Sequence, residues 1–188
     1  MFRLGSHNTM SYLKPKLWFL KPFAWMAKCQ SKDIEYQYIL GIRYFDMRVR
    51  FDEEGNPEFA HGIMSYKGNV EDVFKWLNNQ DEPIYIRLIL ELTKPSDGTQ
   101  EVFFRTFCKK WVRKYKNLMF HCGRRKYDWE QIYHFKNKEP ELDQQVSSMV
   151  GDKLDDIFIF YYAITHNKKA IKKGTTKNIL LLDYIHIQ

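Results

Sequence analysis

At residues 41–50 the chain reads GIRYFDMRVR, and this stretch decides how the fold is built. Successive side chains of a β-strand point to opposite faces, so Asp46, Arg48 and Arg50 share one face and apolar residues the other. Such a face can be a solvated surface. A parallel strand inside a barrel is covered on both sides, however, and charges there must be paired or bind something. An Arg48 guanidinium held by a carboxylate such as Asp46 is well suited to contact a phosphate oxygen.

Strand-like runs alternate with helix-like runs along the rest of the chain, which predicts β/α units around a mostly parallel sheet. The expected fold class is α/β, in the form of a TIM-like (β/α) barrel that is complete, reduced or distorted. Strands are expected at residues 2–6, 42–51, 58–61, 84–92, 118–122 and 179–185. Apolar residues at helical spacing predict helices at 70–77, 102–115 and 155–171. Residues 144–150 fit a strand or a helix equally well.

Length and composition restrict the class of protein further. The 188 residues fit a single domain, and a hydrophobic share of 44% is enough for its core. The net charge of +7 indicates an anionic partner, and an acidic membrane, a nucleic acid or simply a solvated basic surface would account for it. No nucleic-acid-binding motif is recognised, so no nucleic-acid partner is expected.

The cysteines and the chain's apolar segments carry weaker information. Three cysteines without a CxxC pair indicate neither a disulfide framework nor a thiolate zinc site. We find no signal peptide, and no apolar stretch is long enough to cross a bilayer. We therefore expect a cytoplasmic monomer whose membrane association, if any, is peripheral.

Two histidines stand where strands are expected to end. His7 follows a short apolar strand, and His61 ends another and is followed by glycine. Barrel enzymes place catalytic residues at such strand ends. Most isolated histidines are structural or lie at the surface, so neither histidine is strong evidence alone. Two histidines near Arg48 at one barrel mouth, in contrast, form the set needed for general acid and general base attack on a phosphodiester.

In five segments the sequence resembles the X-domain of phosphatidylinositol-specific phospholipases C. The segments occur in family order, and they are LGSHNT (4–9), GIRYFDMR (41–48), AHG (60–62), IYIRLILE (84–91) and LLDYI (181–185). The first three are the most specific. The resemblance implies one catalytic domain over residues 1–188 that cleaves phosphatidylinositol, or a similar glycerophospholipid, to a cyclic inositol phosphate and diacylglycerol.

The resemblance also implies roles for five residues. His7 would take the proton of the attacking inositol hydroxyl, and His61 would protonate the departing diacylglycerol oxygen. Calcium-dependent members carry acidic metal ligands on the second strand, where bacterial-type enzymes carry an arginine, so Arg48 would replace the ion. Asp183 matches the carboxylate that orients the first histidine, and Asp46 is expected to hold Arg48. The prediction is a mechanism without a cofactor, and the alternative is dependence on Ca²⁺ or Mg²⁺.

Four further residues are candidates for substrate binding. Asn8 stands where bacterial members have an aspartate that supports the second histidine, and its amide can still accept a hydrogen bond from His61. Arg87 and Glu91 share one face of their strand, and they would contact substrate or form a structural ion pair. Arg124 follows the next strand and is a candidate phosphate contact.

An aromatic segment follows the first strand. Residues 16–28 read KLWFLKPFAWMAK, and this mixture of large aromatics with lysine is typical of an interfacial membrane contact. The aromatic side chains are Trp18, Phe19, Phe23 and Trp25. Related enzymes insert aromatics from this region into bilayers, and the resemblance implies the same here. The alternative is a helix whose aromatics pack on the barrel.

Two other functions fit parts of the pattern. A metal-dependent glycerophosphodiester phosphodiesterase or a sphingomyelinase D-like enzyme also uses two histidines on a β/α barrel, but needs several carboxylates for its ion. An inactive barrel would bind membranes without turnover and would need neither histidine. For the phospholipase, the expected partners are a phospholipid or inositol-phosphate substrate and a peripheral membrane surface.

Overall fold

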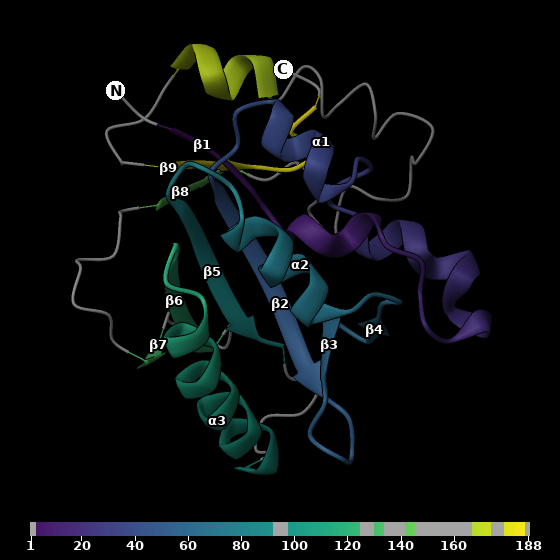
Figure 1. Ribbon diagram of the computed structural model, residues 1–188. Helices are drawn as coiled ribbons and strands as arrows, with labels where there is room; N and C mark the ends of the chain where they lie inside the picture. The colour runs from purple at the N-terminus through teal and green to yellow at the C-terminus, as the bar shows by residue number, and fades with distance from the viewer. Residues whose placement is uncertain are drawn as a thin grey trace.

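The protein has a mixed α/β fold built on one sheet (Figure 1). The structure is a computed structural model that describes residues 3–91, 98–124, 130–133, 142–145, 167–173 and 179–186. The strands are β1 (Arg3–Ser6), β2 (Tyr44–Phe51), β3 (Pro57–His61), β4 (Met64–Ser65), β5 (Ile84–Leu90), β6 (Leu118–Arg124), β7 (Glu130–Tyr133), β8 (Leu142–Gln145) and β9 (Ile179–Leu182).

The sheet has the order β7-β6-β5-β2-β1-β9-β8, and it is parallel from β6 to β8. Strand β7 pairs antiparallel with β6 at the other end. Within the described residues the two edge strands of this order, β7 and β8, do not pair with each other, so the sheet is open and mostly parallel. The predicted α/β class agrees with this sheet, but the described residues do not form the closed barrel of the TIM-like prediction. Of residues 144–150, which fit a strand or a helix, the first two belong to β8, and 146–150 lie outside the described ranges.

His61 reaches the sheet in a different way from the one expected. Strand β3 pairs antiparallel with the far end of β2, and β4 pairs antiparallel with β3. The histidine therefore lies on a β-hairpin that folds back from β2, and not on a parallel barrel strand. The carboxyl end of β2 pairs with Pro57 at the start of β3, and His61 lies at the other end of β3, after that strand has run back along β2.

The helices agree with the predicted pattern where periodicity was strong. They are α1 (Ile34–Ile39), α2 (Val70–Asn78) and α3 (Gly98–Lys114), with 3-10 helices η1 (Thr9–Tyr12) and η2 (Trp18–Ala27). Asn69 caps α2, because its side-chain oxygen accepts hydrogen bonds from the backbone of the first turn. The short α1 was not predicted. Of the predicted helix at 155–171, the structure describes a helical segment at 167–173.

Helices α2 and α3 cover one face of the sheet (Figure 1). Phe45, Met47 and Val49 of β2 are fully buried on this face. Phe74 of α2 packs edge-on against Trp111 of α3, with ring centroids 5.3 Å apart. Each such side chain stabilises the fold by about 1.5–3 kcal/mol when it leaves water. The apolar half of the alternating β2 pattern is thus used for helix packing.

The other face of β2 carries the site. Tyr44 at its start joins a small apolar cluster with Ile179 and Leu181, and its ring stacks on Tyr85 of β5. Asp46 and Arg48 follow on the same face and are buried, with exposures of 0% and 3%. Apolar residues therefore fill the sheet at its amino end, and charged residues take over toward its carboxyl end.

No helix within the described ranges is long and apolar enough to span a membrane.

Candidate active site

His7 lies at the carboxyl end of β1 between two charged partners. Its Nδ1 is 2.5 Å from Oδ1 of Asp183, which follows β9, and its Nε2 is 2.7 Å from Nη2 of Arg48. A guanidinium can only donate, so Nε2 accepts and the ring proton resides on Nδ1, where it is donated to Asp183. This is the tautomer that a general base needs, because the lone pair of Nε2 points away from the orienting carboxylate.

The backbone turns sharply directly after both of these residues. Asn8 follows His7 with a φ of 41°, and Tyr184 follows Asp183 with a φ of 44°. Residues other than glycine adopt this left-handed conformation at a cost of order 1–3 kcal/mol, and such residues cluster at functional sites. The neighbouring strands β1 and β9 therefore both end in turns that hold a site side chain in place.

Arg48 is buried between two carboxylates. Its Nη2 is 3.4 Å from Oδ2 of Asp46, and its Nη1 is 3.5 Å from Oε2 of Glu91. Within the described residues its Nε makes no hydrogen bond. Asp46 also accepts a hydrogen bond of 3.1 Å from the backbone nitrogen of Asn8. The two carboxylates thus hold the guanidinium in place, and its Nε remains as a hydrogen-bond donor for a ligand.

The hairpin holds His61 by hydrogen bonds on both sides. Nδ1 of His61 is 2.8 Å from the carbonyl oxygen of Ala27, which leaves Nε2 as the nitrogen available for proton transfer. The backbone nitrogen of Gly62 donates to Glu91 over 2.8 Å, and Arg50 donates to the carbonyl of Gly62. Because Glu91 also pairs with Arg48, one carboxylate connects the arginine to the hairpin.

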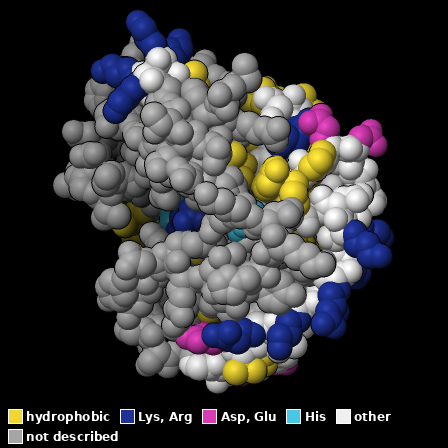
Figure 2. Space-filling model, turned by 90° about the vertical axis from the view of Figure 1, so that its left-hand side faces the viewer, with side chains coloured by type: hydrophobic (Ala, Val, Ile, Leu, Met, Phe, Trp, Pro, Cys, Tyr) yellow, Lys and Arg dark blue, Asp and Glu magenta, His cyan; other side chains and the backbone are white. Residues whose placement is uncertain are grey.

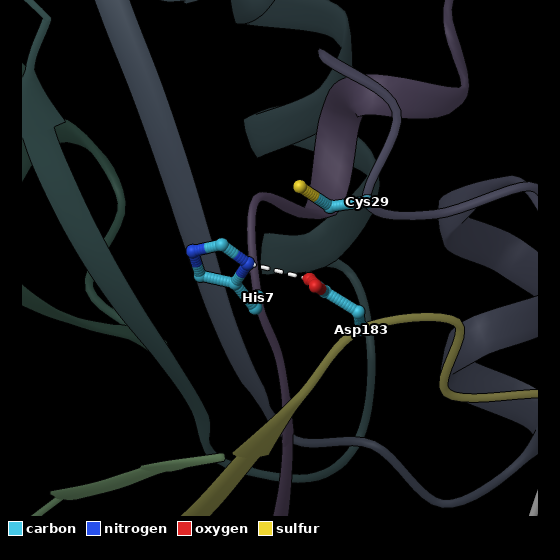
Figure 3. A group of neighbouring side chains, drawn as sticks. All are labelled: His7, Cys29 and Asp183. Atoms are coloured by element: carbon cyan, nitrogen blue, oxygen red, sulfur yellow. Dashed lines mark hydrogen bonds and ion pairs between the residues drawn. The ribbon is translucent and has the colours of Figure 1, made fainter. Parts of the chain in front are cut away.

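Cys29 is the residue of this site that the sequence did not reveal. It is 1% exposed, and its sulfur lies near enough to His7 and His61 for both imidazoles to lower the pKa of the thiol. Figure 3 shows Cys29 next to His7 and Asp183, with its sulfur on the side of the imidazole. The thiol therefore lies between the two histidines and connects them.

Long-range contacts place Cys29. The backbone nitrogens of Cys29 and Gln30 both donate to Oγ of Ser11. Nε2 of Gln30 donates to the carbonyl of His7, directly after β1, and to the carbonyl of Leu182, the last residue of β9. The backbone nitrogen of Tyr184 donates to the Cys29 carbonyl over 2.7 Å. A solitary cysteine has no local motif, so no pattern of neighbouring residues could have indicated this position.

The charges of the site shift its protonation equilibria. Burial acts to lower the pKa of His7, but the carboxylate of Asp183 and the sulfur of Cys29 outweigh it and raise this pKa to about 10. Burial and Asp183 act to raise the pKa of Cys29, while His7 and hydrogen bonds from both histidines lower it to about 7. Burial likewise opposes ionisation of Asp46, yet Arg48 beside it brings the pKa of that carboxyl below its ordinary value. The 2.7 Å contact of Nε2 with the Arg48 guanidinium requires a neutral ring and opposes this rise in the pKa of His7, so Nε2 can act as a base only after the ring has lost its second proton.

The remaining candidates have mixed outcomes. Arg87 is partly buried and lies opposite Asp46 in the register of β5 with β2. Glu91 forms an ion pair with Arg48, so it takes a structural role of the kind that was the alternative to substrate contact. Asn8 does not hydrogen-bond to His61 within the described residues, because Ala27 takes that position. Arg124 ends β6, and its side chain lies outside the described part of the structure.

The aromatic segment does not pack on the sheet. Trp18, Phe19, Phe23 and Trp25 are 77%, 52%, 52% and 42% exposed. They lie on η2, which projects from the side of the molecule in Figure 1. The core-packing alternative therefore fails for these four side chains.

Figure 2 shows histidine and basic side chains together near the middle of another side of the molecule.

Comparison with known proteins identifies the fold. No family model matches the chain, and no curated protein does. The phosphatidylinositol-specific phospholipase C from Listeria monocytogenes is similar in structure, with a TM-score of 0.59, 15% sequence identity, and coverage of 96% of this chain and 87% of that one. A mutant of the corresponding enzyme from Staphylococcus aureus has a TM-score of 0.60, 16% identity, and coverage of 96% and 85%.

A further structure of the Staphylococcus aureus enzyme, which concerns the modulation of its membrane binding, matches with a TM-score of 0.58, 15% identity, and coverage of 96% and 85%. The similarity extends over almost the whole chain in all three cases. At this level of identity it establishes a common fold.

Proposed function

We propose that this protein is a phosphodiesterase of the phospholipase C kind, which cleaves phosphatidylinositol or a similar glycerophospholipid. The observation that carries the proposal is the position of His7, whose two ring nitrogens face Asp183 at 2.5 Å and Arg48 at 2.7 Å. An oriented base beside a fixed guanidinium is what attack on a phosphodiester requires. The structural similarity to phosphatidylinositol-specific phospholipases C supports this substrate class and the interpretation of the open sheet as a reduced TIM-like barrel.

The proposed reaction begins at Nε2 of His7. This nitrogen takes the proton of the inositol 2-hydroxyl, and the oxygen attacks the phosphorus of the same molecule. His61 gives the proton on its Nε2 to the departing glycerol oxygen, so the P–O bond to diacylglycerol breaks and a cyclic inositol phosphate remains. His7 ends protonated and His61 deprotonated, and the reverse transfers would accompany hydrolysis of the cyclic product.

Arg48 supplies the fixed positive charge in this proposal. When substrate enters, its phosphate oxygens can accept from Nε and Nη1, which make no hydrogen bond within the described residues. The phosphate would also draw Nη2 away from His7 and free Nε2 to accept the hydroxyl proton. Asp46 and Glu91 hold the guanidinium during this exchange, because each already pairs with it.

The exposed aromatics support a site at a lipid surface. Trp18 and Phe19 are the two most exposed of the four, and Ala27 at the end of the same η2 segment hydrogen-bonds to His61. Insertion of η2 into the headgroup region would therefore bring a membrane close to the proposed acid. Lys21 lies among the aromatics and would favour an acidic lipid surface.

The test is cleavage of phosphatidylinositol in vesicles by matched histidine variants. We expect His7→Ala and His61→Ala each to reduce turnover by at least about 100-fold, since each removes one proton-transfer group. His186→Ala is the control, because that residue hydrogen-bonds to Ser31 and takes no part in the proposed proton transfers. Circular dichroism must show that all three variants are folded. Full activity of either site variant would reject the assignment.

The metal-dependent alternative predicts a different response. A glycerophosphodiester phosphodiesterase or sphingomyelinase D-like site would need Asp46 and Glu91 as ligands of Mg²⁺ or Ca²⁺, and both are paired with Arg48 here. Activity that is lost in chelator and restored by either ion would favour that alternative. Vesicle binding with no turnover of any phosphodiester would favour an inactive membrane-binding domain.

A further inference from the structure

We propose that His7, Cys29 and Asp183, with Asn8, form a binding site for a divalent transition-metal ion such as Zn²⁺, and that the bound ion inhibits the enzyme. The binding part stands on the geometry alone, and the inhibitory part rests on the proposed function. The three residues come from segments far apart in the sequence and meet beyond the ends of β1 and β9 (Figure 3).

The donor atoms are already gathered. One ligand atom from each of His7, Cys29 and Asp183 lies within 4.8 Å of the other two, and all three residues are buried. Tetrahedral Zn²⁺ with bonds of about 2.0–2.3 Å separates its ligands by roughly 3.3–3.6 Å. A separation at the 4.8 Å limit would therefore contract by roughly 1.5 Å at most, while the 2.5 Å between Nδ1 and Oδ1 must open by about 1 Å.

Asn8 provides the second observation. Its side chain is 1% exposed, and its Oδ1 has no hydrogen-bond partner within the described residues. The amide faces the cluster, since its Nδ2 is 3.9 Å from the sulfur of Cys29. A half-turn of the amide exchanges nitrogen and oxygen and directs a carbonyl oxygen at the cluster. A bound ion would give this buried oxygen the partner that it otherwise lacks, so Asn8 is suited to be the fourth ligand.

The donor set selects the kind of ion. A thiolate and an imidazole favour Zn²⁺ and related ions over Ca²⁺ and Mg²⁺, which prefer oxygen ligands. Of the two nitrogens of His7, Nε2 faces the positive Arg48, so Nδ1 is the ligand. The thiolate and the carboxylate of Asp183 together bring two negative charges, which match a divalent ion.

Inhibition follows from where the protons go. On binding, the thiol of Cys29 releases its proton to solvent, and the imidazole proton of His7 moves from Nδ1 to Nε2. A protonated Nε2 cannot accept the substrate hydroxyl proton. It would also face the donor Nη2 of Arg48, which is 2.7 Å away, so Arg48 must move. One ion would therefore disable the base and displace the phosphate contact.

The experiment measures binding of Co²⁺, a spectroscopic substitute for Zn²⁺, to the full untagged chain. We expect one Co²⁺ per chain, a thiolate-to-cobalt charge-transfer band in the near ultraviolet, and loss of that band when Zn²⁺ is added. Cys29→Ala should abolish the band. Cys108→Ala is the matched control, because it removes a buried thiol on the helix-packed side of the sheet and should keep the band.

Activity is measured as a ratio within each variant, with and without Zn²⁺. We expect Zn²⁺ to reduce phosphatidylinositol cleavage by the unaltered chain by about 100-fold, the scale of a lost general base, and chelator to restore it. Absence of the cobalt band from the unaltered chain, or its persistence in Cys29→Ala, would overturn the metal site. A band without any phosphatidylinositol cleavage would uphold the metal site and reject the proposed function. Binding without loss of activity would overturn the inhibitory role.

Discussion

Replacement of Arg48 by lysine should reduce turnover far more than it reduces stability. At 3.4 Å from Asp46 and 3.5 Å from Glu91, the guanidinium attracts each carboxylate by roughly 5 kcal/mol, before desolvation is subtracted, at an effective dielectric of about 20. Lysine keeps that charge but lacks the planar fork that can hold two carboxylates and still donate to a phosphate. The substitution therefore separates the electrostatic role of Arg48 from its contact with the transition state.

The expected loss of kcat for Arg48→Lys is about 10²–10³-fold, or about 2.7–4 kcal/mol, which is the usual cost of one donor to a developing oxyanion. Arg48→Gln is the contrasting variant. It removes the cation that Asp46 and Glu91 share, so it should also lower the free energy of unfolding by about 3–5 kcal/mol. Turnover of phosphatidylinositol and urea denaturation measure the two quantities. Wild-type turnover in Arg48→Lys, or unchanged stability in Arg48→Gln, would refute the reasoning.

Three further predictions concern the base and the membrane contact. Asp183→Asn removes the strongest of the interactions that raise the pKa of His7, so kcat should fall by about 10²–10⁴-fold and the pH–rate profile should move toward lower pH. In the unaltered chain the His7 ring should lose its second proton near pH 10, and in Cys29→Ala it should do so at lower pH, because the sulfur also raises the pKa of His7. Titration of the ring by nuclear magnetic resonance measures both values, and an unshifted titration in Cys29→Ala would contradict this prediction. Trp18→Ala should weaken binding to acidic vesicles in a sedimentation assay by about 10- to 100-fold, because about 1.5–3 kcal/mol of apolar burial is lost. Ile39→Ala is the control, since Ile39 is 78% exposed but lies on α1, and this variant should bind vesicles as tightly as the unaltered chain.

Local patterns in the sequence were sufficient for six strands of the sheet and for its principal helices, but they did not predict β4 or β7 and left β8 undecided. The alternation in β2 predicted which side chains share a face, and the structure buries Phe45 and Met47 under helices while Asp46 and Arg48 lie on the other side. The reason is that a strand's two faces are set by its own backbone. The fold resemblance that the comparisons found also agrees with the motifs noticed in the sequence.

Features that depend on distant contacts were not predictable. Cys29 enters the site because Ser11 and Tyr184 hold its backbone, and nothing in the residues around it indicates this. The expected hydrogen bond between Asn8 and His61 is absent from the described residues, since Ala27 takes that place through the η2 segment. Each of these contacts joins segments many residues apart, and their geometry exists only after the chain has folded.

The most direct test of the proposed chemistry is ³¹P nuclear magnetic resonance of phosphatidylinositol vesicles incubated with the purified chain in excess chelator. A metal-free His7 and His61 pair working around Arg48 predicts that the signal of a cyclic inositol phosphate appears at an undiminished rate, and that the His7→Ala variant produces none. Absence of any cyclic product, or a product that forms only when Ca²⁺ or Mg²⁺ is supplied, would contradict the mechanism.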